Sequence, residues 1–214
     1  MKNRTVFSIG KREALEELIG APWTGVSFHE GLLSAAETPL PCARLCEAIG
    51  QGFQNSVTID VRTLDCPGGL RALGVPIDDG HMAREMAQRA VMPFESARRI
   101  IQTTPRLERP ARFITIGPIE QPDILVSYLQ PEAAMKLLRR WQQVFGRRLN
   151  TGLSATTAIC AAAAAAYTAN ELVFSFGCPD SRDYGGIAAH QLIATLPVSL
   201  AARLTREEVH HGLM

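Results

Sequence analysis

The spacing of hydrophobic positions predicts helices and strands that alternate along the chain. Helical spacing with good helix formers marks residues 11–19 and 131–146, and the alanine-rich stretch at 154–169. The same pattern predicts helices around 42–49, 81–90 and 93–102, and a closing helix after Pro197. Ser154 is placed to cap the start of its helix.

Shorter segments rich in β-branched residues predict strands at 26–28, 56–61, 113–116, 124–129, 172–176 and 192–196. The segments 113–116 and 124–129 flank Gly-Pro and Gln-Pro breakers, so they are expected to pair as a hairpin. Residues 178–186 (CPDSRDYGG) are predicted to form a loop. The order of elements lacks a regular βαβ rhythm and no linker divides it. We therefore expect one α+β domain over residues 1–214, with a mixed sheet packed by helices.

Composition and charge narrow the class of protein. The chain of 214 residues is 46% hydrophobic and 20% charged, which is ordinary globular usage. Its net charge of +1 lacks the basic excess of a nucleic-acid binder, so no nucleic-acid partner is expected. No apolar stretch reaches the roughly 18 residues that span a bilayer, and the first residues lack a signal-peptide core. These features predict a cytoplasmic protein with no membrane partner, and a homodimer is one possible assembly.

Two of the five cysteines occupy similar positions in the sequence. Cys66 and Cys178 are each followed by proline, which fixes the backbone from which the sulfur projects. Iron–sulfur clusters often take a Cys-Pro ligand at such a turn, and neighbouring glycines let the backbone approach closely. Free cysteine is also a small residue that is often buried without any function. Both interpretations stay open from the residues alone.

The other three cysteines lie in predicted helices. Cys160 precedes six alanines, so it is either a core thiol or a ligand on a helix that can approach another backbone closely. Cys42 and Cys46 are four residues apart and share a helix face, which fits chelation or a core stripe equally well. The spacings match neither a zinc ribbon nor a ferredoxin motif. Any metal site must therefore be assembled by the fold from distant segments.

Several short segments resemble a known family in their order and spacing. They are residues 44–48 (RLCEA), 66–69 (CPGG) with Leu73-Gly74, 131–138, 154–160, 177–186 and Leu196-Pro197. Over nearly the whole chain they resemble domain-of-unknown-function family 169, soluble proteins common in anaerobic bacteria and archaea. The resemblance singles out four cysteines, namely Cys46, Cys66, Cys160 and Cys178, and leaves Cys42 as an extra. Ala189-His190 stand where the family leads us to expect acidic residues, so no acid–base role carries over there.

Four thiolates from four separate segments suit either a [4Fe–4S] cluster or a tetrahedral zinc ion. The two Cys-Pro turns and the anaerobic distribution of the family favour the cluster. Structural thiols without a metal remain the third interpretation. Cys46, Cys66, Cys160 and Cys178 are thus the expected metal ligands.

Arg182 is the foremost polar candidate outside the cysteines. It lies four residues after Cys178 in a glycine-flanked segment, where it could clamp a substrate carboxylate or neutralise cluster charge. A surface ion pair with Asp180 or Asp183 is the equally open alternative.

Four further residues are candidates with weaker signals. Tyr184 either donates a proton or merely packs, and Glu47 beside Cys46 is a candidate base. Ser154 and Thr156 lie at a predicted helix start, where backbone N–H groups could bind a substrate carboxylate.

These residues suggest three functions. The first is a lyase-type enzyme, in which an open cluster iron acts as a Lewis acid in desulfuration or dehydration of a small carboxylate-bearing substrate. Cys46 would then hold the fourth iron loosely or leave it open. The second is a closed four-cysteine cluster for electron transfer or redox sensing. The third is a structural zinc site or a metal-free binding module.

Overall fold

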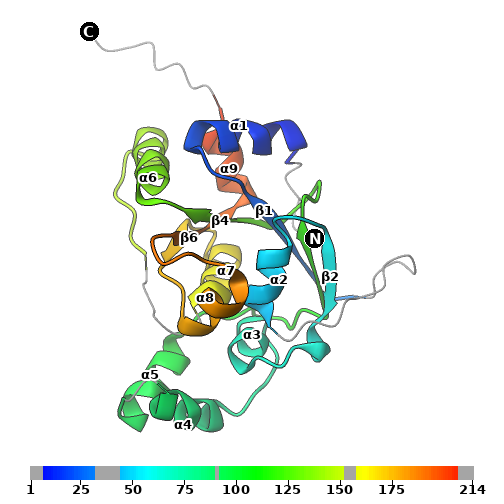
Figure 1. Ribbon diagram of the computed structural model, residues 1–214, viewed down its shortest axis with the longest axis vertical. Helices are drawn as coiled ribbons and strands as arrows, with labels where there is room; N and C mark the ends of the chain where they lie inside the picture. Colours follow the sequence, from blue (N-terminus) through cyan, green and yellow to red (C-terminus); the bar gives the residue numbers. More distant parts are fainter. Residues whose placement is uncertain (1–6, 32–43, 90–91, 152–157, 207–214) are drawn as a thin grey trace.

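The computed structural model describes residues 7–31, 44–89, 92–151 and 158–206. Within these residues the strands form a six-stranded sheet in the order β2-β3-β1-β4-β6-β5, and each strand pairs antiparallel with its neighbours (Figure 1). The strands are β1 Thr24–His29, β2 Val57–Asp60, β3 Phe113–Gly117, β4 Ile124–Leu129, β5 Val173–Ser175 and β6 Leu192–Pro197. Strands were predicted at all six places.

Helices cover both faces of this sheet, which confirms the α+β class (Figure 1). They are α1 Ile9–Ile19, α2 Leu45–Gln51, α3 Pro67–Ala72, α4 Asp79–Arg89, α5 Phe94–Thr103, α6 Pro131–Phe145, α7 Ala158–Ala169, α8 Pro179–Gly185 and α9 Val198–Leu204, with a short 3-10 helix η1 at Val61–Thr63. No helix among the described residues is long and apolar enough to cross a membrane.

The two faces of the sheet belong to different hydrophobic clusters. Helices α1, α6 and α9 pack on one face, and α2, α3 and α7 pack on the other. Strand β4 shows the alternation that this requires, because Leu125 and Leu129 join the first cluster whereas Ile124 and Val126 join the second. The second face is the one that carries the cysteines.

The predicted hairpin between 113–116 and 124–129 is wrong. Strand β1 lies between β3 and β4 and pairs with both of them. The connection crosses β1, where the Ser27 hydroxyl donates to the Gln121 carbonyl at 3.0 Å. The Asp123 carboxylate accepts from the Phe28 backbone N–H at 2.8 Å. Since β1 is buried throughout most of its length, both of its edges need partners, and the two later strands supply them.

The predicted loop at 178–186 is also wrong, because residues 179–185 form α8 and the residues on either side are its caps. Pro179 occupies the first helical turn, where its missing N–H costs no hydrogen bond. The Ser181 hydroxyl accepts from the Cys178 backbone N–H at 2.7 Å, which fixes the helix start. Gly186, with a φ of 70°, ends the helix. The proline, serine and glycine that suggested a loop are therefore the start and stop signals of a short helix.

Helices α4 and α5 pack mainly on each other and extend away from the sheet (Figure 1). Met82, Met86 and Ile101 belong to their small separate core. Arg71 of α3, whose side chain is buried, anchors the pair. Its Nε donates to Asp79 at 2.9 Å and its Nη1 to the Thr104 carbonyl at 2.8 Å, so it holds both ends of the pair.

Candidate functional site

The fold brings together the helices that carry four cysteines. Cys46 lies in α2 and Cys160 in α7, and both are buried. Cys66 and Cys178 are the half-buried residues that precede α3 and α8. Helix α2 contacts α7 and α8, and α7 contacts α3, so the four helices form one packed group (Figure 1). Cys42 lies outside the described residues.

Cys66 and Cys160 form a hydrogen bond between their side chains. This bond, with help from the Gly69 N–H at 3.4 Å and from Arg44, lowers the pKa of Cys66 to about 6, even though burial opposes the shift. The same bond and complete burial raise the pKa of Cys160 well above its ordinary value. The two shifts have opposite signs, so the environment favours the thiolate form of Cys66 and the neutral thiol form of Cys160.

Cys46 lies close enough to the other thiols for their charges to interact. Burial raises the pKa of Cys46 to about 12, and the negative charges of Cys66 and Cys178 add to that rise. Its Sγ donates weakly to the Asp180 carbonyl, at 3.8 Å. Cys160 also experiences the charges of all three other cysteines. One group of four thiols thus shares a single electrostatic environment.

Glycines let the helices around the thiols approach closely. A Cβ added at Gly50 would lie 2.7 Å from the Gly185 carbonyl oxygen, so α2 and α8 touch through their backbones. A Cβ at Gly185 would lie 3.1 Å from the Cys46 carbonyl oxygen. A Cβ at Gly69 would lie 3.5 Å from the Cys66 sulfur. Sequence analysis singled out the glycines next to Cys66 and Cys178 but missed the contact between Gly50 and Gly185.

Arg44, which sequence analysis assigned no role, is the arginine beside the thiols. It is the residue before α2, and its Nη1 lies 2.6 Å from an Asp180 carboxylate oxygen. Its guanidinium stacks over the Tyr184 ring, 4.3 Å from the centroid. Its charge helps to lower the pKa of Cys66 and partly opposes the burial that raises the pKa of Cys46. The only sequence signal was its place in the segment RLCEA, which carries the family resemblance.

Arg182 holds backbone rather than an acidic side chain. Its guanidinium donates to the carbonyls of Ala188 at 2.6 Å, Gln191 at 3.3 Å and Phe176. These bonds connect α8 to the segments before it and after it. Asp180, proposed as its surface partner, pairs with Arg44 instead. The role of Arg182 as a carboxylate clamp stays a prediction, and such a clamp would compete with these three carbonyls.

For two of the other residues that the sequence analysis proposed, the structure gives a position but does not assign a role. Tyr184 is half exposed beneath Arg44, and Glu47 is half-buried on α2 next to Cys46. Ser154 and Thr156 lie outside the described residues.

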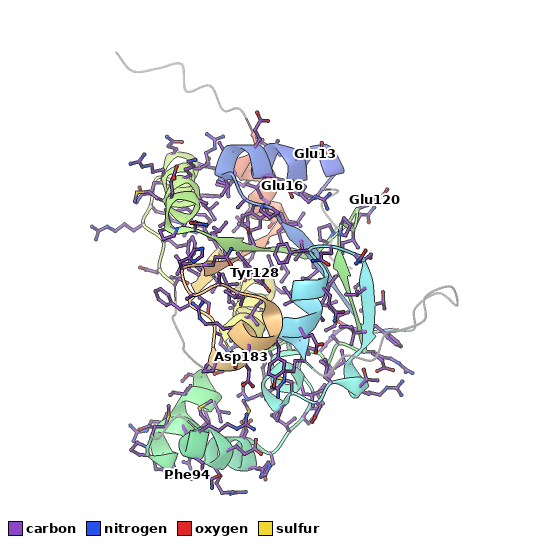
Figure 2. All side chains as sticks on the ribbon, in the orientation of Figure 1. Glu13, Glu16, Phe94, Glu120, Tyr128 and Asp183 are labelled. Carbon is purple, nitrogen blue, oxygen red and sulfur yellow. The ribbon has the colours of Figure 1, made fainter. Side chains whose placement is uncertain are left out.

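Tyr128 of β4 is a polar residue near the thiols that sequence analysis passed over, because it falls within a predicted strand. Its hydroxyl is buried, has no hydrogen-bond partner among the described residues, and lies close to Gly185 and Cys46. Figure 2 labels Tyr128 in the middle of the molecule. Burial, and then the charge of Cys46, raise the pKa of Tyr128, so its hydroxyl keeps its proton.

The donor set can be compared with what a metal requires. Among the described residues, no group of three or more His, Cys, Asp or Glu side chains is arranged to hold a metal ion. The four thiols nevertheless supply the soft donors that iron–sulfur clusters use. In a cluster each thiolate binds a different iron, so the ligand sulfurs lie farther apart than they do around one ion. The buried, unpartnered Tyr128 hydroxyl beside Cys46 is a further polar group that something bound there could engage.

Comparison with known proteins gives two matches. The family model of domain-of-unknown-function family 169, described as uncharacterised ArCR, matches residues 27–207. An uncharacterised protein of Methanocaldococcus jannaschii is 26% identical over 143 residues, which cover 62% of this chain and 60% of that relative. No solved structure matches the chain.

Proposed function

The chain belongs to domain-of-unknown-function family 169, whose description names no activity, and we propose from the site itself that the protein binds a [4Fe–4S] cluster. The observation that carries this proposal is the group of four cysteines on four packed helices, whose charges act on one another. Burial and the neighbouring thiols raise the pKa of Cys46 and Cys160, so ionising these two thiols has an electrostatic cost in the metal-free protein. That electrostatic cost is removed when a cluster binds the thiolates.

Cys66, Cys160 and Cys178 are the proposed firm ligands. Two of them sit at helix starts stiffened by Pro67 and Pro179, and Cys66 already accepts an N–H hydrogen bond on its sulfur. Such N–H bonds to ligand sulfurs stabilise cluster charge. Buried alanines of α7 around Cys160 give the site an apolar wall. These contacts support the proposal that the three thiols hold a cluster.

We further propose that Cys46 is the weakest ligand, which makes the protein a lyase-type enzyme of the desulfidase kind. Cys46 lies inside α2, without a proline after it, and its sulfur is turned towards the Asp180 carbonyl. When bound, the cluster would supply a Lewis-acidic iron that accepts a sulfur or oxygen leaving group. The substrate would be a small molecule bearing a carboxylate. Tyr128, which keeps its proton beside Cys46, joins Tyr184 as a candidate proton donor.

A closed cluster for electron transfer or redox sensing is the second candidate. The observation in its favour is that the charges of Cys66 and Cys178 act on Cys46, so Cys46 belongs to the same group as the other thiols. A fully ligated iron offers no site to a substrate. The two candidates therefore differ in what Cys46→Ala does.

The test is anaerobic purification, with iron, acid-labile sulfide and zinc counted on the sample that gives the absorption spectrum. We expect about four iron per chain and a broad visible charge-transfer band. Ala substitutions of Cys66, Cys160 and Cys178 should each remove both. Cys42→Ala is the matched control, because it removes a thiol that the family resemblance leaves out.

Cys46→Ala separates the candidates. Retention of the cluster in this variant supports the open-iron enzyme, and loss equal to that of Cys66→Ala supports the closed cluster. A colourless protein with stoichiometric zinc, or with no metal at all, would refute the iron–sulfur proposal.

A further inference from the structure

Two arginines share one carboxylate beside the thiols. The Arg44 Nη1 lies 2.6 Å from Asp180 Oδ2, and the Arg89 Nη1 lies 3.9 Å from the same oxygen. Arg89 ends α4, whereas Arg44 precedes α2, so residues distant in sequence converge on α8. Two guanidinium groups from different parts of the chain therefore converge on one carboxylate oxygen.

Arg44 is held in position and remains reachable from solvent. Tyr184 supports the face of its guanidinium, and Asp180 orients its edge. About a fifth of its side chain is exposed, at 22%, so it lies at the border between the thiol site and water. Stacked, oriented arginines are well suited to bind carboxylates, because little side-chain freedom is lost when the ligand arrives.

The position of Arg44 relative to the thiols determines which ligand its guanidinium can bind. Arg44 is two residues before Cys46, and its charge acts on both Cys46 and Cys66. A small molecule that reaches the thiol site with one end can therefore place an anionic group near Arg44 with the other. Arg182 is less suited, since its guanidinium already donates to three backbone carbonyls.

We propose that Arg44 binds the carboxylate of the substrate, with Arg89 adding a second positive charge. The inference rests on the proposed function in one respect only, which is that the other end of this substrate reacts at the cluster. Asp180 is 40% exposed at its side chain, so it can yield its place on Arg44 to the incoming carboxylate. The substrate class is then a short carboxylic acid with a thiol or hydroxyl leaving group near the carboxylate.

Two probe thiols of similar size test this inference on the anaerobically purified protein. 3-Mercaptopropionate carries a carboxylate, and 2-mercaptoethanol carries a neutral hydroxyl in its place. Isothermal titration calorimetry should show that the first binds about tenfold more tightly, the effect expected of one charge-assisted contact. Arg44→Gln should abolish this preference while leaving the affinity for 2-mercaptoethanol unchanged.

Two further variants control for charge and folding. Arg44→Lys keeps the positive charge and should retain part of the preference, which protects the test if Arg44→Gln fails to fold. Arg98→Gln removes an exposed arginine that pairs with Glu95 at 3.5 Å on α5, and it should leave the preference intact. Equal affinities for the two probes in the unmodified protein would overturn the inference. It would also be overturned if Arg44→Gln kept the preference or weakened both probes equally.

The absorption spectra of the same titrations report on the iron separately. A spectral change on addition of either thiol indicates coordination to an open iron. Heat without any spectral change would refute the open-iron enzyme, while the preference for the carboxylate would still decide the role of Arg44.

Discussion

Replacing Cys160 by alanine should remove the thiolate at Cys66 from the metal-free protein. The Cys160 side chain makes the largest contribution to lowering the pKa of Cys66 to about 6, against 9.0 for an ordinary thiol. Without it, only the Gly69 N–H and Arg44 remain to oppose burial. We therefore expect a pKa of Cys66 close to the ordinary value or above it.

This change is large at neutral pH. A thiol with a pKa about one unit below the solution pH is roughly nine-tenths ionised, and one with a pKa two units above it is roughly one-hundredth ionised. Because the thiolate is the nucleophile, alkylation of Cys66 by iodoacetamide should slow by tenfold or more in Cys160→Ala. Cys160→Ser keeps a hydroxyl donor and should preserve most of the reactivity.

Two measurements on the metal-free protein across pH test this expectation: the ultraviolet absorbance of the thiolate, and alkylation followed by mass spectrometry. The signal that is lost in Cys66→Ala is assigned to Cys66. The unmodified protein should show one thiolate appearing with a midpoint of about 6. An unchanged midpoint in Cys160→Ala would refute the assignment of Cys160 as the donor.

The same pKa shift has a consequence for stability. Since the pKa of Cys66 is lower in the folded chain than in the unfolded one, its thiolate stabilises the fold most above about pH 9. This contribution should diminish as the pH falls from 9 towards 6 and should vanish below 6. Cys46 acts in the opposite sense, because its raised pKa favours the neutral thiol and costs stability as the pH rises above 9. Denaturant unfolding of Cys160→Ala should show a shallower dependence between pH 6 and 9.

Four further substitutions, one of which is a control, test the packing of the fold by chemical denaturation. Arg182→Gln should lower the free energy of unfolding by about 2–4 kcal/mol, because it removes bonds from a charged donor to three carbonyls; a loss of substrate binding at unchanged stability would show that it is a clamp instead. Gly50→Ala should cost about 1–3 kcal/mol, since its Cβ meets the Gly185 carbonyl at 2.7 Å. Gly10→Ala, where nothing lies within 4 Å, should instead stabilise by up to about 1 kcal/mol, and similar effects at both glycines would contradict the close crossing. Arg71→Met should cost about 1–3 kcal/mol by freeing the two ends of the α4–α5 pair, and an unchanged unfolding midpoint would argue against that anchor.

The sequence predicted individual elements better than it predicted their partners. Strand positions follow from local patterns of β-branched residues, so all six were found. Pairing is decided by which edges are left open, and the buried strand β1 took the edges of β3 and β4 that a hairpin would have used. The short helix α8 was missed because its proline and glycines are equally typical of a loop and of helix boundaries.

For the candidate site too, the sequence indicated the relevant residue types but not which side chains contact one another. The resemblance to the family picked out the four cysteines that the fold gathers, but the choice between Arg182 and Arg44 depended on distances that no sequence spacing contains. Arg182 is close to Cys178 in sequence, yet the turn of α8 directs its guanidinium to carbonyls. Arg44 lies far from Asp180 in sequence and meets it because α2 and α8 cross.

That crossing also supports the proposal that the thiols share one site. Helices with ordinary side chains pack roughly 8–10 Å apart, which would separate sulfurs on their facing sides. At Gly50 and Gly185 the backbones of α2 and α8 touch, and the alanines of α7 remove side-chain bulk beside Cys160. The glycines have a cost in helix stability that Leu or Met would not incur, whereas the alanines have none, and both residue types let the helices around the cysteines approach closely. A chain that needed only a hydrophobic core could fill this region with larger side chains, so the small residues are themselves an argument that the thiols are brought together for binding.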